Sequence, residues 1–257
     1  MSWALLLISA CDAPHQHQQL VAADAWSPKA TDAPVGDPGP DLHWSGIVRD
    51  QDGVGIEGAT VCVLRHPEIP CETTDAAGSY ATTIPATLRQ FSVQATAMGY
   101  LGEVRLESDP LAASPPVHGW PGYFTLYSAT MAMQQFGAAV PTNGMGLALV
   151  RITTITGGDL AGATATSLPP ATGLYFDAQG RLDPSLTATT TADVVMFGAL
   201  APGTFTVTAF APGKTCTALT EGSAVGGDWP PANGGTTDLD IAADCLTDQV
   251  QVLCQDI

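Results

Sequence analysis

Few residues of this sequence have both the type and the spacing that catalysis requires. A hydrolase of the α/β class needs a Gly-x-Ser-x-Gly nucleophile turn, and none occurs. A zinc peptidase would need His-x-x-Glu and a distant third ligand, whereas His66-Pro67-Glu68 places the acid only two positions from the imidazole. We therefore predict that the protein is not an enzyme, that it has no catalytic residue and that it uses no cofactor.

Two further segments have spacings that could ligate a metal ion. His15 and His17 could chelate one, but they lie in a polar segment for which a solvated spacer is the simpler interpretation. Asp50-Gln51-Asp52-Gly53 is similar to the start of a calcium loop, yet position twelve, which needs a bidentate Glu, is Val61. We therefore predict a hairpin turn here and no metal site.

Acidic residues also gather near the C-terminal end, at Asp238, Asp240 and Asp244. Asp238 and Asp240 are two positions apart, so in a strand both side chains lie on one face. We expect them to form a solvated strand edge.

Five cysteines follow residue 60, and in an exported protein we expect them to form disulfides. Cys62 and Cys71 are nine positions apart, and a bridge between them would stabilise the fold by roughly 2–3 kcal/mol. Among the last three, Cys216 with Cys245 is the favoured pair and Cys216 with Cys254 the second choice. One thiol would remain free in either case. No Cys-x-x-Cys occurs, so a zinc ribbon is not indicated.

The N-terminus predicts export and a lipid anchor. Residues 4–10 form a short apolar run, too short to cross a bilayer as a helix. Ile8-Ser9-Ala10-Cys11 resembles the bacterial lipobox, which implies a signal peptide over residues 1–10 and membrane attachment through a lipid on Cys11. A buried cysteine after an apolar strand is the alternative. Residues 11–41 are rich in Pro and polar residues and predict a disordered tether. We expect a cell-envelope protein, at the periplasmic face or the outer surface.

Charge excludes several classes of partner. The chain has 8 basic and 25 acidic residues, a net charge of −17, so it lacks the clustered cations that nucleic acids and anionic membranes attract. Only 13% of residues are charged and 45% are hydrophobic, which is enough to build folded cores. The 27 glycines and 20 prolines favour turns over long helices.

Residues 42–108 have short β-rich runs separated by turn residues. Phe91, Val93, Ala95 and Ala97 alternate with polar residues, which places them on one face of a strand. Turn chemistry separates such runs, as at Asp75 and Gly78, where we expect a hairpin. This pattern predicts an antiparallel β-sandwich.

The order of motifs in this unit resembles the carboxypeptidase regulatory-like family. The motifs are Gly46-x-Val48-x-Asp50, Asp52-Gly53, Gly58-Ala59-x-Val61, Thr74-Asp75-x-x-Gly78-x-Tyr80 and Gly99-Tyr100. The resemblance implies a fold similar to transthyretin and to carbohydrate-binding-like sandwiches. It also implies a non-catalytic appendage of exported proteins, without catalytic residues to carry over.

The pattern returns in residues 146–257, which predicts a second sandwich. Phe91-x-Val93-x-Ala95 recurs at Phe205-x-Val207-x-Ala209, an offset of 114, whereas Gly58-Ala59-Thr60 recurs at Gly162-Ala163-Thr164, an offset of 104. We therefore expect an insertion in the second unit around residues 171–184. Thr191-Ala192-Asp193-Val194 replaces the Asp-x-x-Gly-x-Tyr element.

Residues 109–145 differ from both units and predict a connector. Phe124, Tyr127 and Met131, with Met133 and Phe136 beside them, approximate one face of a helix over 125–139. We expect that helix to pack against a sandwich; a lid or a partner-binding helix is the alternative. The predicted fold is thus all-β, with two tandem transthyretin/Ig-like antiparallel β-sandwiches joined by a connector with one short helix.

The functional prediction is a non-catalytic, lipid-anchored envelope protein with a structural or recognition role. A carbohydrate-binding protein is the first alternative, because exposed aromatic rings can stack on sugar faces. The candidate rings are Trp120, Tyr123, Phe124, Tyr127, Tyr175, Phe176 and Trp229. An accessory subunit or inactive relative of an exported hydrolase is the second. The expected partners are the membrane, through Cys11, and a polysaccharide or another envelope protein.

Overall fold

The computed structural model describes residues 41–85, 88, 90–108, 122–141, 143–220 and 235–257. The predicted signal peptide, the tether up to residue 40 and the lipidation site Cys11 lie outside these residues, as do His15 and His17. Among the described residues, no helix has the length and hydropathy needed to cross a membrane.

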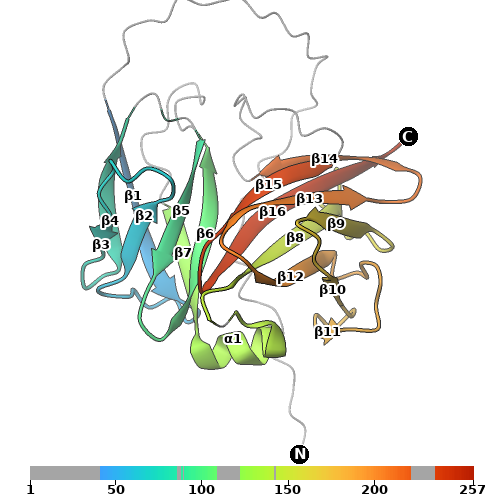
Figure 1. The fold of residues 1–257 in the computed structure, drawn as a ribbon, viewed down its shortest axis with the longest axis horizontal. Helices are drawn as coiled ribbons and strands as arrows, with labels where there is room; N and C mark the ends of the chain where they lie inside the picture. Colours follow the sequence, from blue (N-terminus) through green and yellow to red (C-terminus); the bar gives the residue numbers. More distant parts are fainter. Residues whose placement is uncertain (1–40, 86–87, 89, 109–121, 142, 221–234) are drawn as a thin grey trace, which may run out of the picture.

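Strands form nearly all of the regular structure, and the all-β prediction is confirmed. The first sandwich consists of β1 (Leu42–Asp50), β2 (Thr60–Val63), β3 (Glu72–Thr73), β4 (Ser79–Ile84), β5 (Gln90–Thr96), β6 (Tyr100–Ser108) and β7 (Gly122–Ser128). Helix α1 (Ala129–Phe136) and the 3-10 helix η2 (Gly137–Ala139) follow. The second sandwich consists of β8 (Gly146–Thr154), β9 (Thr164–Leu168), β10 (Gly173–Phe176), β11 (Leu182–Asp183), β12 (Val194–Leu200), β13 (Gly203–Phe210), β14 (Lys214–Thr220), β15 (Thr236–Ile241) and β16 (Cys245–Asp256). Figure 1 shows the two sandwiches side by side, with α1 below the place where they meet.

Each sandwich has its own apolar core. In the first, Trp44 packs on Tyr80 and Phe91, with ring centroids 5.1 and 5.8 Å apart. In the second, Phe197 and Phe205 pack edge to face, with centroids 5.4 Å apart. The alternation that predicted strands in both units is what fills these cores, because every second side chain points inward.

Three strand pairs depart from the predicted antiparallel arrangement. Strand β7 pairs in parallel with β1, and β16 pairs in parallel with both β8 and β6. A 13-stranded sheet therefore runs from one sandwich into the other, and β9, β13 and β15 form a separate three-stranded sheet. A parallel pair joins strands far apart in sequence, so turn residues between neighbouring strands do not predict it.

The connector helix is shorter than predicted, and the face that it buries differs from the predicted one. It begins at Ala129, not at residue 125, because residues 122–128 form strand β7 and bury Phe124 and Leu126 in the first core. Its predicted contact residue Met131 is exposed, and Ala132 and Phe136 are the buried ones. The Ser128 side chain accepts a hydrogen bond from the Met131 N–H and caps the helix.

The internal repeat is confirmed by matching hydrogen bonds. In the first sandwich the buried Thr74 hydroxyl accepts from the Ala59 N–H (2.8 Å) and donates to the Ile56 carbonyl (2.6 Å). In the second, the buried Thr189 hydroxyl accepts from the Ala163 N–H (2.9 Å) and donates to a carbonyl (2.5 Å), that of Leu160.

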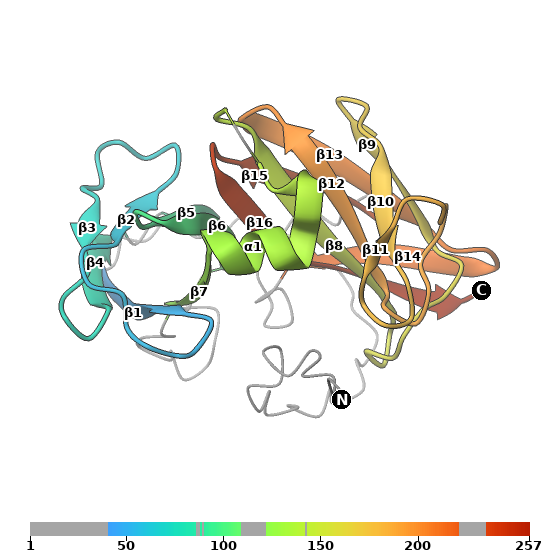
Figure 2. The ribbon, with the colours of Figure 1, turned by 90° about the horizontal axis from the view of Figure 1, so that it is seen from below.

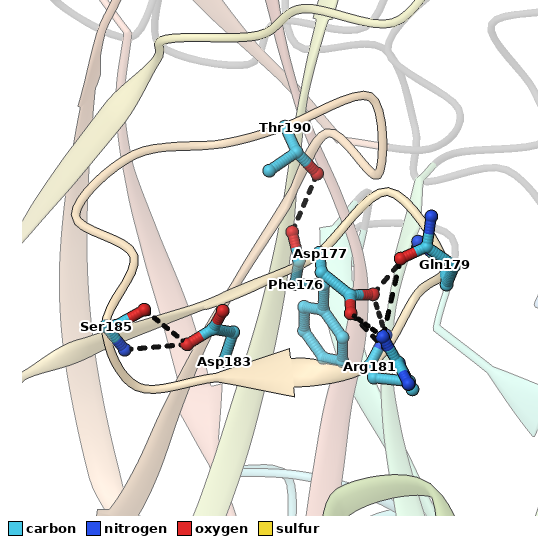
Figure 3. A network of polar contacts seen from close by, with 7 residues as sticks. All are labelled: Phe176, Asp177, Gln179, Arg181, Asp183, Ser185 and Thr190. Atoms are coloured by element: carbon cyan, nitrogen blue, oxygen red, sulfur yellow. Dashed lines mark hydrogen bonds and ion pairs between the residues drawn. The ribbon is translucent and has the colours of Figure 1, made fainter.

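The expected insertion is also present. Ala59 and Thr74 are 15 positions apart, whereas Ala163 and Thr189 are 26 apart, and the β10–β11 hairpin lies between the latter pair. Asp177 organises the hairpin turn by accepting the N–H groups of Gln179 and Arg181 and pairing with the Arg181 guanidinium (Figure 3). These polar contacts stay within one exposed hairpin and its neighbour Thr190, whose hydroxyl donates to the Phe176 carbonyl.

Candidate functional site: the junction between the sandwiches

The two sandwiches meet along strand β16, which lies between β6 of the first and β8 of the second. Residues 245–247 of β16 pair in parallel with residues 102–104 of β6. On its other side β16 pairs in parallel with β8, and its residues 250–256 pair with β14. Main-chain pairing therefore runs from β6 through β16 to β8, with one irregularity in the β16–β8 register between Thr247 and Val250.

Glu103 lies where β6 changes its neighbour. Strand β6 pairs with β7 only through residues 100 and 101 and then continues beside β16, so β7 loses its ladder partner on that edge and keeps β1 on the other. The Glu103 carboxylate accepts the Thr125 N–H of β7 (2.8 Å) and pairs with Arg105 Nε at 2.8 Å. The carboxylate thus satisfies a main-chain donor that would otherwise be unpaired in the interior.

Burial makes the Glu103 carboxyl group a weaker acid than a solvent-exposed glutamate. Desolvation raises the pKa of Glu103 to about 7, although the Arg105 cation opposes the shift, and the charge of Asp248 adds to it. The Arg105 guanidinium also lies over the Phe124 ring, 5.7 Å from its centroid. The cation is therefore held between the carboxylate and an aromatic core residue.

A polar contact joins the two sandwiches at Asp240 of β15. Its carboxylate accepts the Ser92 hydroxyl of β5 at 2.5 Å and forms an ion pair with Arg65. Arg65 Nη2 also donates to the Thr204 hydroxyl of β13 (2.9 Å). The predicted solvated strand edge is therefore wrong for Asp240, whose side chain is 17% exposed because the first sandwich covers it.

The free thiol of Cys245 is packed into the same junction. It is fully buried, it lies 3.1 Å from Gln94 Nε2, and burial raises its pKa to about 11. Gly102 makes the close approach possible, because a Cβ there would lie 2.5 Å from the Cys245 sulfur. Since the thiolate is the reactive form, this cysteine is structural rather than nucleophilic.

Helix α1 covers the junction from outside. Its buried residues Ala132 and Phe136 pack with Leu101 of β6, Leu147 of β8 and Leu246 of β16 in one apolar cluster. Figure 2 shows the helix lying beside β6 and β16, between the two sandwiches. The connector therefore fastens the sandwiches to each other.

This arrangement holds two bodies together. The described residues contain no group of three His, Cys, Asp or Glu side chains that could hold a metal ion. The junction combines main-chain pairing through β16, the polar contacts of Asp240 and of Gln94 with Cys245, and an apolar cluster, all of which resist relative motion of the sandwiches.

The disulfides confirm one predicted pair and correct another. Cys62 and Cys71 are bridged as predicted. The favoured pair of Cys216 with Cys245 is wrong: Cys216 is bridged to Cys254, the second choice. Strands β14 and β16 place Cys216 directly opposite Cys254, whereas Cys245 lies at the other end of β16, in the junction.

The remaining predicted polar residues form turns or surface contacts. Asp50 accepts the N–H groups of Asp52 and Val54, both at 2.9 Å, so the predicted turn is confirmed. Asp238 is exposed and accepts the Thr206 hydroxyl. Asp244 lies in the junction turn, where its carbonyl accepts the Gly102 N–H at 3.1 Å.

The aromatic candidates for sugar binding are not exposed platforms where the structure describes them. Phe124, Tyr175 and Phe176 are buried, and Tyr127 packs edge to face on Phe136 with centroids 5.8 Å apart. The predicted rings Trp120 and Trp229, and the side chain of Tyr123, lie outside the described part. In contrast, Phe210, which the sequence analysis did not select, is 60% exposed.

Sequence reasoning missed Glu103, Arg65 and Ser92, which help to build the junction, and it assigned Asp240 to a solvated edge. One local signal exists for Glu103, an acid in the run Leu101-Gly102-Glu103-Val104, where all four residues are buried. No local signal marks the others, because their partners are remote: Ser92 and Asp240 are 148 positions apart.

Comparisons with known proteins add little to this geometry. No family model matches the chain, so the carboxypeptidase regulatory-like resemblance stays a prediction, and no curated protein matches it. Among solved structures, the chain is similar to the TIE protein of Bacillus anthracis (13% identity, TM-score 0.28, 82% of this chain and 34% of that one). It therefore spans about a third of that protein's length. Two pilins also match: the shaft pilin of Lactobacillus rhamnosus GG (12% identity, TM-score 0.27, 85% and 99% covered) and the minor pilin of Streptococcus agalactiae (9% identity, TM-score 0.29, 84% and 96% covered). We transfer no fold detail or function from similarities this low.

Proposed function

We propose that this protein is a non-catalytic, lipid-anchored envelope protein in which two β-sandwiches form one rigid arm with a structural or recognition role. The observation that carries the proposal is the uninterrupted sheet through β6, β16 and β8. Domains joined only by a linker usually move relative to each other. Here movement would break main-chain pairing, the Arg65–Asp240 contact and the cluster under α1.

The proposed address rests on the N-terminal sequence. The lipobox-like Ile8-Ser9-Ala10-Cys11 would supply the anchor, and residues 11–41 would hold the arm away from the membrane. The motif order of residues 42–108 supports kinship with carboxypeptidase regulatory-like appendages. In bacteria fed radioactive palmitate, the full chain should carry label, Cys11→Ala should carry none and Cys245→Ala should keep it. Label on Cys11→Ala would exclude the proposed anchor.

The rigid arm is tested by solution scattering of the full chain with two glycine variants. At Gly102 an added Cβ would lie 2.5 Å from the buried Cys245 sulfur, whereas at Gly198 it would meet its nearest atom, in Ala139, at 3.6 Å. Gly102→Val should therefore separate β6 from β16 and raise the radius of gyration, and Gly198→Ala should not. If the unmodified protein already scatters as two bodies in many orientations, the arm is not rigid.

A further inference from the structure

The three-stranded sheet of the second sandwich has an unusual outer face. Strands β9, β13 and β15 lie side by side (Figure 2), and their inward side chains Phe205, Val207 and Leu239 are buried in the core. The alternate residues point away from the core. The outward residues Thr204 and Asp240 contact the first sandwich. We call the remaining outward side chains of this sheet the threonine face: Thr164, Thr166, Leu168, Thr206, Thr208, Phe210, Thr236 and Asp238.

The strand register arranges these side chains in rows across the sheet. Thr208 lies between Thr166 and Thr236, and the next row contains Leu168, Thr206 and Asp238. Phe210 lies opposite Thr164 at the end of the face. Phe210 is four positions after Thr206, so Phe210 and the row that contains Asp238 are about 13 Å apart along β13.

The polar groups of the face are held in place by each other. The Thr206 hydroxyl donates to Asp238 Oδ1 at 2.5 Å, and the Thr208 and Thr236 hydroxyls lie 3.0 Å apart. Asp238 keeps a second carboxylate oxygen as an acceptor, and each hydroxyl oxygen has further hydrogen-bonding capacity. At one end lies Phe210, which is 60% exposed and is opposite Thr164 in the strand register.

The equivalent face of the first sandwich is covered. By the repeat offset of 114, Ser92 and Gln94 of β5 correspond to Thr206 and Thr208 of β13. Ser92 is 5% exposed, because it donates to Asp240, and Gln94 contacts Cys245. In the second copy, the first sandwich contacts this face at Thr204 and Asp240, whereas Thr208 and Phe210, farther along β13, are exposed.

Another sandwich does not fit the open face in the same way. The first copy uses Arg65, in the turn after β2, to bind Asp240, whereas Pro169 directly follows β9 at the corresponding place. At the neighbouring row of the sheet, Arg65 is paired with Asp240, and the threonine face itself has no Lys or Arg and one carboxylate, in a chain of net charge −17. Polyanions and a second copy of the chain are thus both disfavoured by charge.

We propose that the threonine face binds a neutral polysaccharide. Sugar rings present an apolar face that can stack on Phe210 and hydroxyl groups that can exchange hydrogen bonds with the threonine row and Asp238. This inference specifies the ligand class of the proposed recognition role. It rests on the proposed function in one respect, the envelope location at which the protein would meet polysaccharides. Its residues include neither Cys11 nor Gly102, so it can fail while the anchor and the rigid arm stand, and the reverse also holds.

The test uses the full chain on an array of neutral polysaccharides (β-glucan, mannan, galactan and chitin) and anionic ones (alginate and hyaluronate). At least one neutral glycan should bind, and its affinity should fall tenfold or more in Phe210→Ala and in Thr208→Lys. Phe210→Trp should restore or strengthen binding, because a larger ring still stacks. Met98→Ala, which truncates a fully exposed side chain of the first sandwich, is the control and should bind normally.

Three results would overturn the proposal: no neutral glycan binds, only anionic glycans bind, or binding survives in both Phe210→Ala and Thr208→Lys. Both residues are exposed, so these variants should fold, which thermal unfolding checks. Amide shifts induced by the bound oligosaccharide should map to β9, β13 and β15.

Discussion

The two sandwiches repeat one module and use its equivalent faces differently. In the first copy, the outer face of β5 is closed by the second copy through Ser92 and Gln94. In the second copy, the outer face of β13 carries threonines and an exposed Phe210. The internal hydrogen bonds around Thr74 and Thr189 are nevertheless the same. The module conserves its core and its turn, whereas its surface decides what each copy contacts.

The last strand of each copy explains how they are joined. Strand β7 has 7 residues and ends at Ser128, which caps helix α1. Strand β16 has 12 residues, so its second half completes its own sandwich beside β14 while its first half pairs with β6. The extra length turns a closing strand into a bridge between the copies.

The largest difference between the copies should come from their disulfides. The Cys216–Cys254 bridge closes 38 positions and the Cys62–Cys71 bridge closes 9. Loss of chain entropy in the unfolded state predicts a cost of about 4 kcal/mol for Cys216→Ala with Cys254→Ala, and about 2–3 kcal/mol for Cys62→Ala with Cys71→Ala. Free energies of unfolding in denaturant measure both; equal costs would contradict the entropic account.

The next largest effect is the pH dependence of stability, which should differ between the two copies. Burial raises the pKa of Glu103 to about 7 in the first sandwich and that of Asp193 to about 6 in the second. Because each folded-state pKa lies above the unfolded value, the folded state holds its proton longer. The protein therefore loses stability as pH rises from about 4.5 to about 7, on the order of 3 kcal/mol for Glu103.

Of these two carboxyl groups, only Glu103 should still change its contribution between pH 6 and 7. Glu103→Gln should flatten the dependence of the unfolding free energy on pH in this window, and Asp193→Asn should flatten it only below about pH 6. Unfolding measured at closely spaced pH values checks this. An unchanged slope in Glu103→Gln would show that another group titrates there.

The smallest effect should be the same in both copies. Thr74→Val and Thr189→Val keep the side-chain shape but leave a buried N–H and a carbonyl without their partner. We expect each to cost about 1–2 kcal/mol, with the two values within a few tenths of each other. Thr83→Val, at an exposed position of β4, is the control and should change stability little. Clearly unequal costs would mean that the turns are alike only in outline.

Strands could be predicted where apolar and polar residues alternate regularly. The prediction was wrong where the same residues fit both the strand period and the helical period. Phe124, Leu126 and Ser128 fit a strand, yet Phe124, Tyr127 and Met131 also fit a helical face, so the helix was predicted to begin at residue 125. The pairing of β7 with β1 decided for the strand up to Ser128. Similarly, the spacing of three cysteines left two pairings open, and only the register of β14 against β16 chose Cys254.

The candidate site was harder to predict than the strands, because its residues have no local pattern. Nothing in the segments around Arg65 and Asp240 marks these two residues as partners, and they form an ion pair only when the two sandwiches dock. Phe210 directly follows the alternating run 205–209, and nothing in the sequence sets it apart from a core aromatic residue. Its exposure depends on which parts of the chain cover the sheet.

The amino-acid sequence was enough to predict a tandem of β-sandwiches with short turns and a disulfide in the first unit. These properties follow from alternation, turn chemistry and repetition, which act over a few residues. The tertiary structure alone decided that β16 joins the two copies, that Glu103 and Cys245 are buried at the joint and that the threonine face stays open. Each of these depends on pairing between segments distant in the chain, where register and docking, rather than local preference, set which groups meet.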